Sequence, residues 1–258
     1  MKFARLISIA WPPIVVLIGV VLVTECVVRV GWIQAFLVPR PSDAAVALVE
    51  NAGEIMIALR DTAIASVIGF ALSAVVGTLI AIALSSGGLV RRAFYPYAVF
   101  FQTVPIIAIA PLLVIWFGFD IRAVTASAFL ASVFPVIANT LTGLLSTELP
   151  LVDLFRLYRA DSLTTLLKLR LPFALPQVFT GLRVAAGLSV IGAIVGEFIT
   201  GGGLGGLIQV ARQQRKIDKV FATLFVASLL GVAMFAIINA LARMALRHWH
   251  ASERADER

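Results

Sequence analysis

Long apolar runs without charge dominate this chain and limit what it can fold into. A helix that crosses about 30 Å of hydrocarbon needs about 20 mostly apolar residues. Continuous runs indicate helices, because the strands of a membrane barrel alternate apolar and polar residues. The sequence therefore predicts an all-α, polytopic membrane protein with about six transmembrane helices. The six runs are Leu6–Thr24, Thr62–Leu84, Ala93–Phe119, Ala123–Thr147, Leu171–Gly196 (interrupted only by Arg183) and Val220–Ala242.

Composition and charge agree with lipid as the solvent. Of the 258 residues, 60% are hydrophobic and 14% charged, and the mean hydropathy is +1.02. The net charge of +7 comes from basic residues in small groups between apolar runs, which argues for membrane topology and against a nucleic-acid partner. Cys26 is the single cysteine, so an intramolecular disulfide is excluded. His248 and His250 lie near the C-terminus without cysteines or a carboxylate cluster, so we expect neither a metal site nor a cofactor.

The basic residues also predict the orientation. No small-x-small cleavage site follows the first run, so we read it as an uncleaved span. With both termini in the cytoplasm, the larger share of the 21 lysines and arginines falls on the cytoplasmic side, as the positive-inside rule requires. The basic group Arg212–Lys219 is the main exception. This assignment predicts a bacterial inner-membrane protein.

Two connecting segments then lie outside. In Pro39–Arg60, Ser42 is a plausible cap for a short helix along the membrane surface. The glycine-rich segment Gly201–Gly206 lacks the lysine of a phosphate loop and predicts a tight turn or a re-entrant bend. Glu25 and Glu197 fall near the outer ends of their spans, where we expect interfacial positions.

Two spans carry small residues at four-residue intervals. Such a stripe lets another helix approach closely, within the subunit or at a pathway or partner subunit. The stripes are Ala65, Gly69, Ser73, Gly77 and Ala81, and Gly181, Ala185, Ser189 and Ala193.

Prolines and polar residues mark positions inside the spans. Pro105 and Pro111 interrupt the third run and Pro135 the fourth, which predicts kinks. The candidates for lining a translocation pathway are the polar residues Gln102, Asn139 and Ser189. Gln102 and Asn139 fall deep in their spans, and the alternative for them is hydrogen bonding between helices.

The segment between Ser146 and Arg170 is the long cytoplasmic loop. Its apolar residues Leu151, Leu154, Phe155 and Tyr158 have the spacing of one helical face. A polar turn follows, in which Asp161 or Ser162 can cap a second helix that Leu171-Pro172 ends. The loop is therefore a short helix–turn–helix at the membrane surface, which either docks onto a partner or packs under its own bundle.

This loop resembles the cytoplasmic loop of permease subunits in binding-protein-dependent ABC importers. That loop reads Glu-Ala-Ala, three residues, Gly, nine residues, Ile, one residue, Leu-Pro. Here Asp153-Leu154-Phe155 stands at Glu-Ala-Ala, Arg159 at Gly, and Leu171-Pro172 at the end. The stretches Gln102-Thr103-Val104-Pro105, Trp116-Phe117-Gly118, Gly196-Glu197-Phe198 and Gly203-Leu204-Gly205 are similar to the nitrate, sulfonate and taurine permease group, which also contains importers of thiamine-precursor pyrimidines and riboflavin.

The resemblance implies a type I importer permease, a single transmembrane domain over 1–258 with a coupling loop at 146–172. It implies two separate ABC ATPase subunits, an extracytoplasmic solute-binding protein and a second permease copy, most simply a homodimer, in the lipid bilayer. The residues it assigns to ATPase coupling are Asp153, Leu154, Phe155, Tyr158, Arg159, Ala160, Asp161, Leu171 and Pro172. Since Arg159 replaces the glycine, we expect a turn that needs no left-handed residue.

Two other classes of function are weighed against this one. An ion-coupled secondary transporter needs paired ionisable residues at mid-membrane, for which Glu25 and Glu197 are poor candidates. A membrane enzyme needs a catalytic cluster of His, Asp or Glu, which the sequence does not suggest. The chain has no Gly-x4-Gly-Lys-[Ser/Thr] motif, so we expect no ATP hydrolysis by this subunit.

Overall fold

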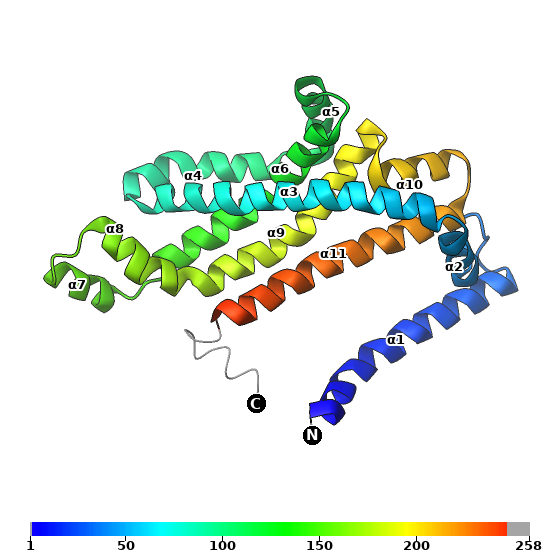
Figure 1. The fold of residues 1–258 in the computed structure, drawn as a ribbon, viewed down its shortest axis with the longest axis horizontal. Helices are drawn as coiled ribbons and strands as arrows, with labels where there is room; N and C mark the ends of the chain where they lie inside the picture. Colours follow the sequence, from blue (N-terminus) through cyan, green and yellow to red (C-terminus); the bar gives the residue numbers. More distant parts are fainter. Residues whose placement is uncertain (1, 247–258) are drawn as a thin grey trace.

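Helices joined by short turns make up the part of the chain that the structure describes (Figure 1). A computed structural model describes residues 2–246, except for the side chains of residues 2–10, 13, 98 and 101, so His248 and His250 lie outside the described residues. The elements are α1 (Lys2–Val30), α2 (Pro41–Glu50), α3 (Ala52–Ser85), α4 (Gly88–Thr103), α5 (Ile106–Phe117), α6 (Ile121–Leu145), α7 (Leu149–Leu157), α8 (Ser162–Thr165), the π turn η1 (Leu166–Arg170), α9 (Leu171–Thr200), α10 (Gly203–Gln213) and α11 (Ile217–Leu246).

Helix α6 packs against α3 on one side and against α9 on another, and small residues make both contacts possible. A methyl group added at Gly69 of α3 would come 2.6 Å from the Cβ of Ala128, and one added at Gly192 of α9 would come 2.6 Å from the Cβ of Ala131. All members of both predicted stripes are buried. The interpretation as close helix packing within one chain is therefore confirmed.

Serine hydroxyls bridge the same helices. The hydroxyls of Ser73 and Ser132 lie 2.7 Å apart between α3 and α6, and Ser127 donates to the carbonyl of Gly192 in α9 at 2.7 Å. Because the serine side chain is short, the helix backbones can stay close, and the buried polar groups still form hydrogen bonds where no water reaches them.

Length and composition show which of the described helices can cross a membrane. Four described helices are long and apolar enough to cross a membrane, namely α3, α6, the continuous helix Ser162–Thr200, and α11. The first predicted run lies within the 29-residue helix α1.

The third predicted span, Ala93–Phe119, is wrong as a single helix. Its residues form α4 and α5, separated where Val104 and Pro105 adopt extended conformations. A proline disfavours helical geometry at the preceding residue and donates no backbone hydrogen bond, which accounts for the break. By contrast, α5 continues through Pro111 and α6 through Pro135, so these two prolines do not end their helices.

At one end of the bundle α1 meets α2 (Figure 1, right). Glu25 accepts hydrogen bonds from the backbone N–H of Ser42 at 3.1 Å and from its hydroxyl at 2.8 Å, and it pairs with Arg29 at 2.7 Å. The prediction that Ser42 caps the surface helix is wrong, because the cap position belongs to Arg40. Ser42 binds the end of α1 instead.

The glycine-rich segment lies at this same end. Gly201, with φ of +83°, ends α9 in the left-handed conformation, and α10 begins two residues later. The predicted tight turn is thus confirmed for Gly201-Gly202, whereas Gly203, Gly205 and Gly206 belong to the first turn of α10.

Glu197 is deeply buried behind this turn, so its predicted interfacial position is wrong. Its side chain accepts hydrogen bonds from the Thr62 hydroxyl at 2.7 Å and the Gly205 N–H at 2.8 Å, and the residue is 2% exposed. One partner, Thr62, lies 135 residues away in α3, and the other, Gly205, lies in the next helix, so the apolar run around Glu197 revealed neither.

Candidate functional site

The predicted helix–turn–helix lies at the other end of the bundle, to the left in Figure 1. Its first helix, α7, begins after Glu148, with Pro150 in the first turn, where a missing N–H costs nothing. Val152 is the buried residue of α7, and its N–H donates to the Glu148 carbonyl at 3.2 Å. The short surface helix predicted from the apolar spacing is therefore confirmed.

A left-handed residue ends α7. Arg159 has φ of +51°, and its N–H donates to the Arg156 carbonyl at 2.9 Å while the Ala160 N–H donates to the Phe155 carbonyl at 2.9 Å. This pair of bonds is the Schellman motif, in which glycine usually holds the left-handed position. The expectation that the turn at Arg159 needs no left-handed residue is therefore wrong.

The second helix of the loop does not end before the fifth span. Asp161 precedes α8, and α8, η1 and α9 form one continuous helix over Ser162–Thr200. Leu171-Pro172 was expected to end the loop helix, but it lies inside this continuous helix, directly after the π turn. The Leu171 N–H donates to Leu166, five residues back, and such a widened turn accommodates a proline that has no N–H to donate.

Packing fixes the base of the loop on the bundle. Leu166 and Leu171 lie against the buried cluster of Leu144, Ala174 and Val178, which joins α6 to α9. A force on the loop therefore reaches two packed spans through a continuous helix.

The two faces of α7 differ in exposure. Val152 is buried and Leu151 and Phe155 are half-buried, whereas Leu157 is 81% exposed and Tyr158 is 80% exposed. Leu154 and, from α8, Leu163 are also exposed. The spacing of 151, 154, 155 and 158 thus combined residues from both faces, and it missed Leu157, which sits one turn beyond Leu154 on the outer face.

Charged residues lie close in sequence to these exposed apolar residues. Asp153 pairs with Arg156 at 3.2 Å along α7. A hydrogen bond from the Thr164 side chain lowers the pKa of Asp161 below its ordinary value, so this carboxylate is charged at neutral pH. Ala160, which directly precedes Asp161 in sequence, is half-buried.

The three pathway candidates lie in different surroundings. Gln102 is exposed near the end of α4, beside the break at Val104, and not deep in a helix. Asn139 is half-buried and donates to the Pro135 carbonyl of its own helix at 2.9 Å. Ser189 is fully buried and donates to the Ala186 carbonyl at 2.9 Å. The described fold does not bring the three together.

Comparison with protein families decides the class of the chain. Residues 73–247 match the family described as binding-protein-dependent transport system inner membrane component. The chain belongs to this family. Both the continuous helix Ser162–Thr200 and the loop before it fall inside the matched part of the permease.

Curated relatives of the permease are transport proteins of the same kind. It is 36% identical, over 83% of its length and 86% of the relative's, to the formylaminopyrimidine transport permease protein ThiX of Halalkalibacterium halodurans. It is 27% identical, over 88% of its length and 84% of the relative's, to the putative aliphatic sulfonates transport permease protein SsuC of Bacillus subtilis.

Solved structures show the same fold. The permease matches a chain of the inward-facing MetNI methionine ABC transporter with a TM-score of 0.59 and 18% identity, over 74% of its own length and 94% of that chain. The type I importer fold and the function expected from the resemblance are confirmed: this is a transmembrane permease subunit of an ABC importer.

Proposed function

We propose that α7 is the coupling helix of the permease and docks in a groove of a separate ABC ATPase subunit. The observation that carries this proposal is the exposure of Leu157 and Tyr158, with Leu154 beside them, on a helix that projects from the end of the bundle (Figure 1). Apolar side chains in water are costly, and a helix that offers them in one patch is suited to a partner surface. The coupling residues expected from the resemblance are retained, and Leu157 is added.

The rest of the assembly follows from this role. Within a single transmembrane domain, residues 146–172 form the coupling loop; the ATPase subunits hydrolyse ATP, and an extracytoplasmic binding protein delivers the solute. Support comes from the family and from the absence of a phosphate-loop motif in the sequence. A second copy of the permease completes the pathway, with Gln102 beside the break at Val104 as a lining residue. The chain lies in a bacterial inner membrane with both termini in the cytoplasm.

The solute belongs to the classes that the relatives transport. The greater identity to ThiX makes a formylaminopyrimidine the first compound to test, and aliphatic sulfonates are the second class. Uptake into proteoliposomes that contain the permease, its ATPase and its binding protein measures both.

The docking proposal is tested by co-purification of the ATPase at matched membrane levels. A double substitution, Leu157→Ser with Tyr158→Ser, removes the most exposed apolar contacts. Because buried aromatic anchors at interfaces often contribute about 2 kcal/mol or more, we expect at least a ten-fold loss of bound ATPase together with uptake. Insertion into the membrane should be unchanged, since both side chains are exposed on the described chain.

A matched control lies at the opposite end. Val49 on α2 is 76% exposed, and Val49→Ser should leave ATPase binding intact. Phe155→Ala tests the inner face, where we expect a loosened α7 and a smaller loss of ATPase. Full ATPase binding and uptake by the Leu157/Tyr158 variant would refute the coupling role.

A further inference from the structure

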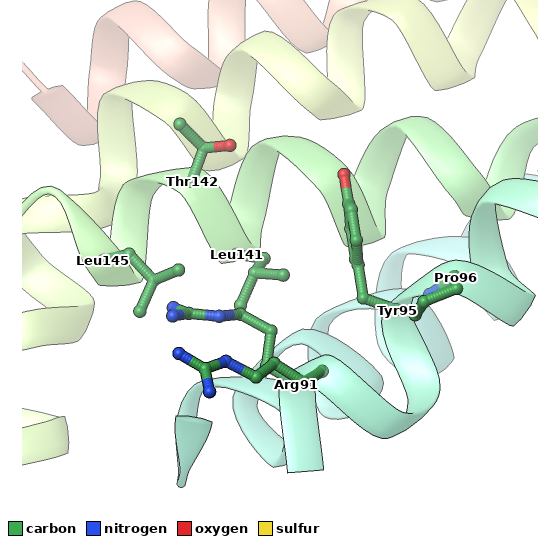
Figure 2. Close-up of a pocket in the computed structure, with 7 residues that line it drawn as sticks. Arg91, Tyr95, Pro96, Leu141, Thr142 and Leu145 are labelled. Atoms are coloured by element: carbon green, nitrogen blue, oxygen red, sulfur yellow. The ribbon is translucent and has the colours of Figure 1, made fainter. Parts of the chain in front are cut away.

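A cleft of about 460 Å³ lies between the start of α4 and the end of α6, at the same end of the bundle as α7 (Figures 1 and 2). Its walls are mainly apolar, from Pro96, Leu141 and Leu145. Polar groups come from two guanidinium groups, visible in Figure 2, and from Tyr95 and Thr142. The seven lining residues are Arg91, Arg92, Tyr95, Pro96, Leu141, Thr142 and Leu145.

The two arginines bring positive charge, and no carboxylate among the described residues forms an ion pair with them. Among the ion pairs and hydrogen bonds between described side chains, none involves Arg91 or Arg92. The Thr142 hydroxyl already donates to the Ala138 carbonyl at 2.8 Å. The cleft therefore joins two cationic donors to an apolar wall, a combination that suits an anion carrying a hydrocarbon chain.

The position of α4 points to lipid as the source of that anion. Among its described side chains, α4 buries none, and Phe94, Tyr97 and Phe100 are exposed along it beyond the arginines. Basic residues followed by aromatic ones are typical of the boundary between headgroups and hydrocarbon. Basic pockets between transmembrane helices on the cytoplasmic side bind anionic headgroups, and the guanidinium fork matches the geometry of a phosphate.

We propose that this cleft binds the phosphate-bearing headgroup of an anionic phospholipid. Arg91 and Arg92 hold the phosphate, and an acyl chain runs along Leu141 and Leu145. The cytoplasmic leaflet as the lipid's source rests on the proposed orientation. Lipid retention by the permease needs neither ATPase binding nor uptake. A failure of the lipid proposal is therefore distinguishable from a failure of the proposed function.

Native mass spectrometry of the full-length permease, exchanged into an equal mixture of phosphatidylglycerol and phosphatidylcholine, tests the proposal. The wild type should retain phosphatidylglycerol preferentially, and Arg91→Gln with Arg92→Gln should lower that retention about ten-fold. Arg91→Lys with Arg92→Lys should restore most of it. Arg212→Gln with Lys216→Gln removes the same charge from exposed residues at the opposite end and should retain the lipid.

The contrary outcomes are distinct. If the wild type shows no preference for phosphatidylglycerol, the proposal is overturned, whether or not the glutamine variant folds. If the glutamine variant retains as much phosphatidylglycerol as the wild type, the proposal is overturned as well. Thermal stabilisation by millimolar inorganic phosphate alone, lost in the glutamine variant, would assign the cleft to a free anion. Loss of the dimer together with the lipid would show that a second copy covers the cleft.

Discussion

The carboxylate of Glu197 and the hydroxyl of Thr62 lie 2.7 Å apart, although 135 residues separate them in sequence. The same hydroxyl accepts from the Leu204 N–H at 2.9 Å, and the carboxylate accepts from the Gly205 N–H at 2.8 Å. These bonds tie the start of α10 to both α3 and α9. They satisfy backbone donors of the first turn of α10, which have no partner within their own helix.

Replacing Glu197 with Ala should destabilise this end of the permease. The Gly205 N–H would be left buried without its acceptor, which costs about 1–3 kcal/mol. We expect a lower unfolding temperature in detergent and faster hydrogen exchange at the Leu204 and Gly205 amides. Glu50→Ala, at an exposed carboxylate on α2, is the control and should change neither measurement. If Glu197→Ala and Glu50→Ala unfold at the same temperature, the hydrogen bonds of Glu197 do not stabilise this end of the permease.

Gly77 offers a second test, at the contact of α3 with α6. A methyl group there would lie 2.9 Å from the Cβ of Val136, so Gly77→Leu cannot be accommodated without separating the helices. Folded yield by size-exclusion chromatography should fall severely. Val75→Leu is the control, because Val75 is exposed on the same helix. Equal yields of the Gly77 and Val75 variants would contradict the contact.

The sequence was informative wherever a local pattern determined the structure. The four-residue stripe in α3 and the apolar spacing of the loop correctly predicted a packed face and a surface helix, because each depends on helical periodicity alone. The pattern could not say which side of α7 faces the bundle. That depends on where α6 and α9 meet the loop, so the pattern grouped the half-buried Phe155 with the exposed Tyr158 and left out Leu157.

Residues whose role depends on partners in other helices were harder to interpret. The burial of Glu197 depends on Thr62 and Gly205, and the binding of Glu25 by Ser42 depends on how α1 meets α2. The break at Val104 was only partly predictable. Pro105 and Pro135 look alike in sequence, yet α6 continues through Pro135 while the third run divides at Pro105. Neighbouring helices decide whether a span tolerates proline.

Orientation is open to a direct labelling experiment. Ser162, at the α7 end, and Gln213, at the α10 end, are both exposed. In a Cys26→Ser background, cysteine substituted for Gln213 should react with an impermeant maleimide in intact cells. Cysteine substituted for Ser162 should react only after permeabilisation, because the proposed orientation places it in the cytoplasm. The reverse labelling pattern would place the loop outside and exclude contact with a cytoplasmic ATPase.

Arg159 provides the most local prediction, because its backbone alone is at issue. In the left-handed backbone conformation, a residue with a side chain is about 1 kcal/mol less stable than glycine. Arg159→Gly should therefore stabilise the end of α7. The Ala160 amide, which donates to the Phe155 carbonyl, should then exchange with solvent about five-fold more slowly.

A second copy of the same motif serves as a replicate for that measurement. At the end of α10, Arg215 has φ of +59° and the Lys216 N–H donates to the Ala211 carbonyl at 3.0 Å. Arg215→Gly should therefore slow exchange at Lys216 by a similar factor. Arg156→Gly is the opposite control, because glycine inside α7 weakens the helix by about 1 kcal/mol. If Arg159→Gly leaves the Ala160 exchange rate unchanged or speeds it, the left-handed turn does not limit the stability of this loop.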